Sequence, residues 1–273
     1  MKALRLLPEQ VRTGSLILVN RDYDYAEPGR PQANCSGMER SSKHVRAEAL
    51  SVLGGRSGAP VLLARRAAVL FAGLMDEIGG WSRIVPVSGY RTLAEQKDIW
   101  NSSLAEHGKD FTNAYVALPG HSEHQTGLAL DLGLKKDEID FLCPDFPDSG
   151  ICRTFRERAP EYGFIHRYPS GKEKVTGINH EPWHFRYVGT PHGEIMEKEG
   201  LTLEEYVFFL RDFPHGRRPY LFAAGGRQIA VSWLAARREE VTWLSVDERL
   251  PHSVSGDNVN GFIITEWRDG YVA

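Results

Sequence analysis

The segment Ser122-Glu-His-Gln-Thr-Gly-Leu-Ala-Leu-Asp-Leu-Gly-Leu134 gives the clearest indication of the fold. From Leu128 onward, leucine alternates with small or acidic residues, which is the period of a β-strand. Such a strand places its leucines on one face and the residues between them on the other. We therefore expect a strand that packs its leucines into a core and holds Asp131 on the opposite face, with His124 just before it.

Other segments complete a predicted α+β fold. Short apolar runs predict strands at residues 14–20, 84–88 and 183–188. Apolar periodicity near 3.6 predicts helices at residues 48–53, 61–78, 151–162 and 203–213. Thr92-Leu-Ala-Glu95 has the form of a capping box and predicts a helix running towards Trp100.

The composition changes after Phe213. Short alternating segments follow at residues 220–223, 228–233, 241–246 and 261–267, separated by turn residues such as Gly225-Gly226. We predict two domains, a larger one over residues 1–213 and a small β-rich one over residues 214–273.

Composition excludes several classes of protein. The 273 residues are 41% hydrophobic and 25% charged, as in an ordinary globular chain, which excludes disorder. The 33 basic and 36 acidic residues give a formal charge of −3, which argues against a nucleic-acid partner. No apolar run reaches the roughly 18 residues of a membrane helix, and no signal peptide is recognisable. We expect a soluble cytoplasmic chain as written, or an extracytoplasmic one if an anchor before Met1 was removed.

The cysteines give no indication of a metal site. Cys35, Cys143 and Cys152 contain no C-x-x-C pair, which argues against a thiolate zinc site. Cys143 and Cys152 flank one loop; they either pair in an oxidising compartment or stay free thiols.

Two segments offer candidate zinc ligands. His124 and Asp131 supply an imidazole and a carboxylate on adjoining backbone, which suits zinc; the alternative is a structural aspartate with a loop histidine, and His121 competes with His124 as ligand. In Glu181-Pro-Trp-His184, the histidine begins an aromatic strand and would complete a His/Asp/His set. Glu181 would then be free as the base that a catalytic zinc site needs; otherwise it is a surface residue.

Ser88-Gly-Tyr-Arg91 joins a strand end to the capped helix. We expect Gly89 to relieve backbone strain at this turn. Arg91 either stabilises a developing oxyanion, binds a substrate carboxylate or bonds loop carbonyls as a structural residue. Gln96 lies one helical turn further on and is either a supporting residue or exposed. No G-x-S-x-G elbow, H-E-x-x-H helix or phosphate-binding glycine loop is present.

Together these segments resemble the zinc D-alanyl-D-alanine peptidases related to the hedgehog amino-terminal fold, and among them the VanY-type D,D-carboxypeptidases. The resemblance rests on three motifs in the family's order and extends over most of the chain: Ser88-Gly-Tyr-Arg91, Ser122-x-His124-x2-Gly127-x-Ala129-x-Asp131 and Glu181-x-Trp183-His184. It implies an antiparallel sheet with flanking helices and a small β-rich carboxy-terminal appendage.

The resemblance also implies the chemistry. It identifies His124, Asp131 and His184 as ligands of one Zn²⁺ per chain, Glu181 as general base and later proton donor, and Arg91 as the stabiliser of the oxyanion. It implies substrate contacts by Ser122 and Gln96. The implied substrate is a peptidoglycan precursor pentapeptide that loses its terminal D-alanine, which would deplete the target of glycopeptide antibiotics.

Three departures and several rivals accompany the resemblance. The amino-terminal anchor typical of VanY-type enzymes is missing, residues 135–152 look unfamiliar, and residues 101–118 are longer than expected. Rival enzymes are a D,D-dipeptidase, a dual dipeptidase and carboxypeptidase, and a cell-wall endopeptidase. A non-catalytic zinc-containing wall-binding module is the rival from another class.

Overall fold

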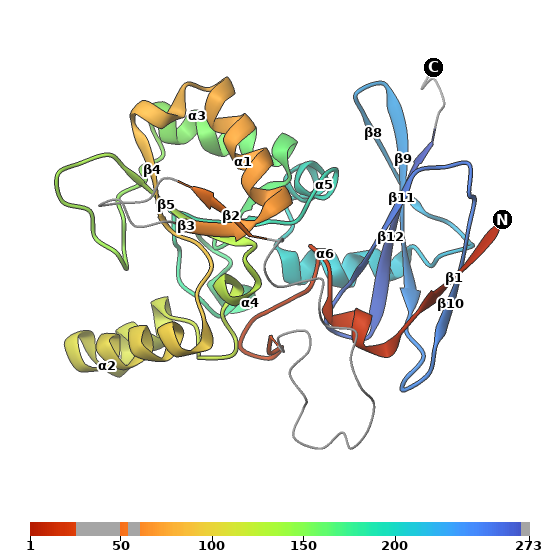
Figure 1. The fold of residues 1–273 in the computed structure, drawn as a ribbon, viewed down its shortest axis with the longest axis horizontal. Coiled ribbons are helices and arrows are strands. Elements are labelled where there is room, and N and C mark those ends of the chain that lie inside the picture. The colour runs from red at the N-terminus through yellow and green to blue at the C-terminus, as the bar shows by residue number, and fades with distance from the viewer. Residues whose placement is uncertain (26–49, 54–60, 269–273) are drawn as a thin grey trace. The chain divides into compact units, whose positions relative to one another are not determined.

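The computed structural model describes residues 1–25, 50–53 and 61–268 (Figure 1). The chain divides into two compact units, one of Val19–Gly193 and one that joins Met1–Leu18 to Glu194–Ala273. This partition differs from the predicted boundary at Phe213. The reason is that the first strand, Lys2–Leu6, pairs with a strand near the other end of the chain, and the sequence between them gives no sign of this pairing.

The unit Val19–Gly193 contains a four-stranded antiparallel sheet. Its strand order is β4 (Ile84–Ser88), β5 (Ala129–Leu134), β7 (His184–Tyr187) and β6 (Phe164–His166). The α-helices among the described residues of this unit include α1 (Arg65–Glu77), α2 (Leu93–Tyr115), α3 (Gly150–Arg158) and α4 (Glu173–Thr176). A separate hairpin is formed by β2 (Leu50–Leu53) and β3 (Val61–Ala64).

The core of this unit lies between one face of the sheet and the helices α1 and α3, which Figure 1 shows side by side. Leu130 and Leu132 of β5 reach this core, as the leucine alternation predicts. They meet a fully buried aromatic cluster that includes Phe71, Phe155 and Phe185. The sheet is thereby fixed on one side, so its other face can hold polar groups in fixed positions.

The second unit is mostly β-structure. β1 (Lys2–Leu6) pairs with β10 (Thr242–Val246), and a four-stranded antiparallel sheet has the order β11 (His252–Gly256), β12 (Gly261–Arg268), β9 (Arg227–Ala235) and β8 (Tyr220–Ala224). A small core of Leu6, Leu244, Val246, Phe262 and Ile264 joins them. The chain passes between the units within α5 (His192–Glu199), and α6 (Leu203–Phe209) follows.

Several predicted elements are confirmed. The strands predicted at residues 84–88, from Leu128 onward and at residues 183–188 are present as β4, β5 and β7. The four strands predicted after residue 219 are present as well. The capping box is present: the Thr92 hydroxyl accepts a hydrogen bond from the Glu95 amide, and the Glu95 carboxylate accepts one from the Thr92 amide at 2.7 Å. Helix α2 then continues well past Trp100, with a non-helical residue at Gly108.

Three predictions of secondary structure are wrong. Residues 50–53 form a strand rather than a helix, and residues 61–64 form its partner before α1 begins; residues 48–49 lie outside the described residues. Residues 14–20 do not form a strand, although residues 16–19 are buried. The Leu18 amide donates to the carbonyl of Asp257 instead of to a strand ladder.

Two other sequence expectations concern cysteine and membranes. Cys143 and Cys152 are free thiols, and burial raises the pKa of each to about 11. Within the part of the chain that the structure describes, no helix is both long and apolar enough to cross a bilayer.

Candidate metal centre

The polar face of the sheet carries a row of three residues from three neighbouring strands. The register pairs Ser88 of β4 with Asp131 of β5, and Asp131 with His184 of β7. Because side chains alternate along a strand, His184 points away from the core that Phe185 and Tyr187 enter. The central strands of the sheet therefore place Asp131 and His184 side by side.

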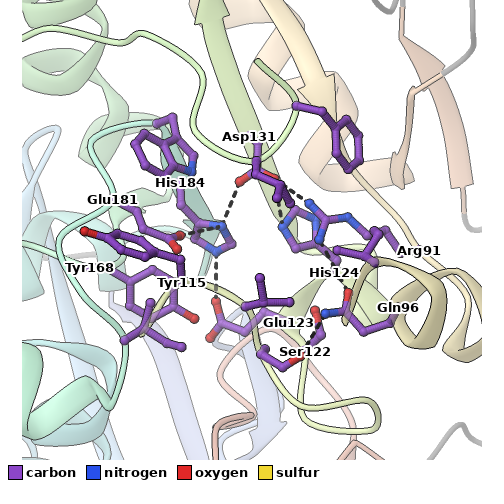
Figure 2. A pocket seen from close by; sticks show the side chains of 17 residues that line it. Arg91, Gln96, Tyr115, Ser122, Glu123, His124, Asp131, Tyr168, Glu181 and His184 are labelled. Atoms are coloured by element: carbon purple, nitrogen blue, oxygen red, sulfur yellow. Dashed lines mark hydrogen bonds and ion pairs between the residues drawn. The ribbon is translucent and has the colours of Figure 1, made fainter. Parts of the chain in front are cut away.

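A third candidate metal ligand, His124, comes from the turn before β5. Residues Glu123–Thr126 form a short 3-10 helix that ends at Gly127, whose φ of 72° lies in the left-handed region that glycine tolerates best. This turn carries His124 over the end of the sheet. His124 Nε2 lies 3.1 Å from Asp131 Oδ2, and His184 Nδ1 lies 2.8 Å from Asp131 Oδ1 (Figure 2).

These three side chains meet the requirements of a zinc site. One ligand atom from each lies within 4.8 Å of the others, and all three residues are buried. Tetrahedral zinc with bonds of roughly 2.0–2.2 Å places adjacent ligand atoms about 3.3–3.6 Å apart. The separations of 3.1 and 2.8 Å above run to different oxygens of Asp131 and are shorter than this. Imidazole and carboxylate are also the ligand types that zinc prefers.

The second ring nitrogen of each histidine faces an oxygen atom. His124 Nδ1 lies 2.6 Å from the carbonyl oxygen of Gly89, and His184 Nε2 lies 3.5 Å from Glu123 Oε2. In metal sites, a histidine ligand usually donates its other ring N–H to a carbonyl or carboxylate. Both rings therefore point their remaining nitrogen towards Asp131, and the residues present fit a zinc ion.

The electrostatics of the three groups follow from burial and from their mutual contacts. Burial, reinforced by the charge of Arg91, lowers the pKa of His124 to about 4 and keeps it neutral, as a ligand must be. Burial alone would raise the pKa of Asp131, but the neighbouring histidines hold it well below its usual range. For His184 the effect of burial is outweighed by the carboxylates of Asp131 and Glu123, which raise its pKa to about 9, so a metal that binds at Nδ1 would have to displace a proton.

Glu181 lies at the edge of this group. Its Oε2 is 3.8 Å from His184 Nδ1, and its amide donates to the carbonyl of Tyr168. Figure 2 shows its carboxylate directed towards the ring of His184. Burial raises the pKa of Glu181 to about 8, helped by the negative charge of Asp131 and opposed by His184. A carboxyl group with such a pKa can both take and return a proton near neutral pH.

Arg91 reaches the site from the junction between β4 and α2. Its Nη2 donates to Asp131 Oδ2 at 2.6 Å, and its Nε donates to the hydroxyl of Ser88 at 2.8 Å. Its Nη1 approaches Gln96 Oε1 at 3.4 Å, while Gln96 Nε2 donates to the carbonyl of Ala117. Gln96 is therefore buried against Arg91 rather than exposed.

Two sequence-based expectations at the site need correction. His121 is not part of the His/Asp/His group, because its Nδ1 lies 2.8 Å from the carbonyl oxygen of Asn20. Gly89 does not have a φ in the left-handed region, so it does not relieve strain. A side chain there is excluded for another reason: a Cβ atom would lie 2.4 Å from the carbonyl oxygen of Leu62.

A cavity of about 470 Å³, part of it open to solvent, lies over the group. Ser122 is buried and lines its wall beside Arg91 and Gln96. Phe141 and Leu142 also line it, which places part of the unfamiliar segment 135–152 at the site. The Phe141 ring lies 5.5 Å from the guanidinium carbon of Arg91.

Sequence reasoning missed a buried ionic group behind His184. Glu123 Oε1 accepts hydrogen bonds from Arg167 Nε at 2.8 Å and from Arg186 Nη1 at 2.7 Å. Burial would raise the pKa of Glu123, but the two guanidinium groups hold it well below its usual range. The alternation in β7 was a usable signal for Arg186, which shares a face with His184; no comparable pattern points to Arg167.

Comparison with known proteins places these residues in a family context. The model of the family described as "VanY: D-alanyl-D-alanine carboxypeptidase" matches residues 64–190, which include all the site residues above. Over 260 residues the chain is 32% identical to a D-alanyl-D-alanine carboxypeptidase of Enterococcus faecium, covering 94% of this chain and 76% of that protein. Over 125 residues it is 53% identical to the bifunctional D-Ala-D-Ala dipeptidase and carboxypeptidase VanXYC of Enterococcus gallinarum, covering 45% of this chain and 66% of that one.

Two solved structures are similar as well. The vancomycin resistance D,D-dipeptidase VanXYg, solved with a D-Ala-D-Ala phosphinate analog, superimposes with a TM-score of 0.85 at 42% identity, covering 98% of this chain and 99% of that one. A VanY D,D-pentapeptidase mutant from a VanB-type resistance cassette, solved with Zn(II), gives a TM-score of 0.52 at 28% identity, covering 71% and 98%. The similarity to VanXYg therefore spans both units of the chain.

Proposed function

The chain belongs to the VanY family of D-alanyl-D-alanine carboxypeptidases, and on that premise we propose that it is a zinc hydrolase that removes the terminal D-alanine from peptidoglycan precursor pentapeptides. The observation that carries the proposal is the buried group His124, Asp131 and His184, with Glu181 beside it in one cavity. Removal of the terminal D-alanine from the precursors would deplete the D-Ala-D-Ala target of glycopeptide antibiotics.

The proposed site holds one zinc ion through His124, Asp131 and His184. When bound, zinc supplies a Lewis acid for the scissile carbonyl and a water whose pKa falls from 15.7 towards about 7. Glu181 takes a proton from the attacking water, whose oxygen bonds to the carbonyl carbon. The C–N bond then breaks, and Glu181 returns the proton to the amine of the departing D-alanine.

Residues on the cavity wall are proposed to orient the substrate. We assign Arg91 to the oxyanion that develops on the scissile carbonyl, because its guanidinium is held by Ser88 and Asp131 at a fixed junction. Ser122 is proposed to contact the substrate directly. Gln96 is proposed to contribute to the same contacts, supported by its position between Arg91 and the carbonyl of Ala117.

A dipeptidase activity is the second candidate. It is favoured by the similarity to VanXYg over nearly the whole of both chains and by the 53% identity to VanXYC. The carboxypeptidase and dipeptidase reactions break the same D-Ala–D-Ala bond, so one site can serve both. A non-catalytic wall-binding module has no need for Glu181 and Arg91 beside a complete ligand set, and an endopeptidase would cut within the peptide.

Substrate choice is tested by comparing two peptides. We expect the purified chain with zinc to release D-alanine from a pentapeptide ending in D-Ala-D-Ala and to release it more slowly from free D-Ala-D-Ala. Amino-acid analysis of both reactions gives the two kcat/KM values. Cleavage at an internal bond, or no release from either peptide, would contradict the proposal.

Replacement of Arg91 separates its two candidate roles. We expect Arg91→Lys to lower kcat by about 10²–10³-fold, because a lysine loses the fixed fork of donors. A small change in KM would indicate a contact made only in the transition state, whereas a large rise in KM would indicate binding of the substrate carboxylate. Arg153→Lys on the exposed face of α3 is the control. Wild-type kcat and KM in the Arg91 variant would remove it from the site's chemistry.

A further inference from the structure

The carboxylate of Glu123 is buried behind the proposed zinc site, and its two oxygens have different surroundings. Only 2% of the residue is exposed. Oε1 receives both guanidinium contacts, from Arg167 and Arg186, and these two arginines are themselves fully buried. The two contacts hold Oε1 in place.

The other oxygen faces the ring of His184. Glu123 Oε2 lies 3.5 Å from His184 Nε2; both atoms are buried, and among the residues that the structure describes neither makes a hydrogen bond of normal geometry. Figure 2 shows the ring of His184 between Glu123 on one side and Asp131 on the other. An unprotonated Nε2 would leave two buried acceptors facing each other, which is costly, so this arrangement favours a proton on Nε2 directed at Glu123.

The proton on Nε2 decides which nitrogen can bind metal. A neutral imidazole with its N–H at Nε2 has its lone pair at Nδ1, which here lies 2.8 Å from Asp131 Oδ1. His124 receives the same support from a backbone carbonyl, that of Gly89. His184 instead depends on a side chain, which mutation can change.

We propose that Glu123 is a positioning residue that orients His184 for zinc. Its carboxylate, held in place by Arg167 and Arg186, would accept a hydrogen bond from the Nε2–H of His184. This inference rests on the proposed function, because it concerns the same zinc site. The competing explanation is that Glu123 only balances the charge of two buried arginines and has no effect on the metal.

Two variants distinguish these explanations. Glu123→Asp keeps the negative charge but shortens the side chain by one methylene, so it cannot reach the arginines and His184 together. Glu123→Gln keeps the length but removes the charge that draws the N–H of His184. If charge balance were the whole role, the aspartate variant would bind zinc as the wild type does.

The experiment measures zinc affinity of the full chain by competition with a chromophoric chelator, and the electronic spectrum of the Co²⁺-substituted protein. We expect both variants to bind zinc about 10–100-fold more weakly than the wild type, with an altered Co²⁺ spectrum. Their kcat should fall more than their KM changes, and saturating zinc should restore part of it. Glu161→Asp, at a half-exposed ion pair with Arg158, is the matched control.

The outcomes separate this inference from the function on which it rests. Wild-type zinc affinity in a folded Glu123→Asp variant would overturn the inference while leaving the proposed function intact. Failure of both variants to fold would also overturn it, in favour of a purely structural role. Failure of the wild type itself to bind zinc would contradict the proposed function and the inference together.

Discussion

Glu181→Gln is expected to lower kcat by about 10²–10⁴-fold, the usual contribution of a general acid–base group. Glutamine has nearly the same shape but cannot accept the proton of the attacking water. The zinc content should stay at the wild-type level, because Glu181 lies beside the ligand group and is not one of its three members. KM should change much less than kcat, since the amide still fills the space of the carboxylate.

The measurement pairs steady-state kinetics on a pentapeptide with metal analysis of the same samples. Glu161→Gln serves as the control for loss of a carboxylate elsewhere in the same unit. Turnover at the wild-type rate by the Glu181 variant would remove this residue from the mechanism. Loss of zinc would instead mean that Glu181 contributes to the metal site.

Asp131→Asn is expected to have the other large effect, with loss of stoichiometric zinc and a fall in kcat/KM of about 10³-fold or more, because the metal supplies several kcal/mol of transition-state stabilisation. Asp131 is the central member of the site: its two oxygens contact His124, His184 and Arg91. An amide oxygen carries no charge and is a poor zinc ligand. A single substitution therefore removes a ligand and the ion pair that holds Arg91.

Zinc titration and thermal unfolding of the Asp131 variant, with and without metal, check this expectation. Wild-type Asp131 should allow zinc to raise the melting temperature, because a ligand that binds only the folded state stabilises it. In Asp131→Asn this shift should nearly vanish. Asp145→Asn, which removes an exposed partner of Lys136, is the control. Equimolar tight zinc in the Asp131 variant would contradict the assigned ligand set.

The parts of the site that sequence predicts are those that depend on strand alternation. The leucines of β5 fix which face Asp131 occupies, and the aromatic residues of β7 do the same for His184. Adjacent pairing of these strands then brings the two residues together. A local pattern of this kind is readable because each side chain's direction follows from its neighbours in the chain.

The parts that sequence does not predict depend on contacts between distant segments. Glu123 gains its role only when Arg167 and Arg186 arrive from other elements of the fold. The apolar run at residues 61–64 reads as the start of a helix until its partner strand at residues 50–53 is known. Likewise, β1 shows no sign of its pairing with β10, so the extent of the second unit does not follow from composition.

A catalytic zinc ion at His124, Asp131 and His184 would make hydrolysis dependent on metal, so D-alanine release from a pentapeptide is measured before and after metal removal. We expect dialysis against a zinc chelator to abolish release and one equivalent of Zn²⁺ to restore it. Release that continues unchanged in the chelated, metal-free protein would rule out a catalytic metal at these residues.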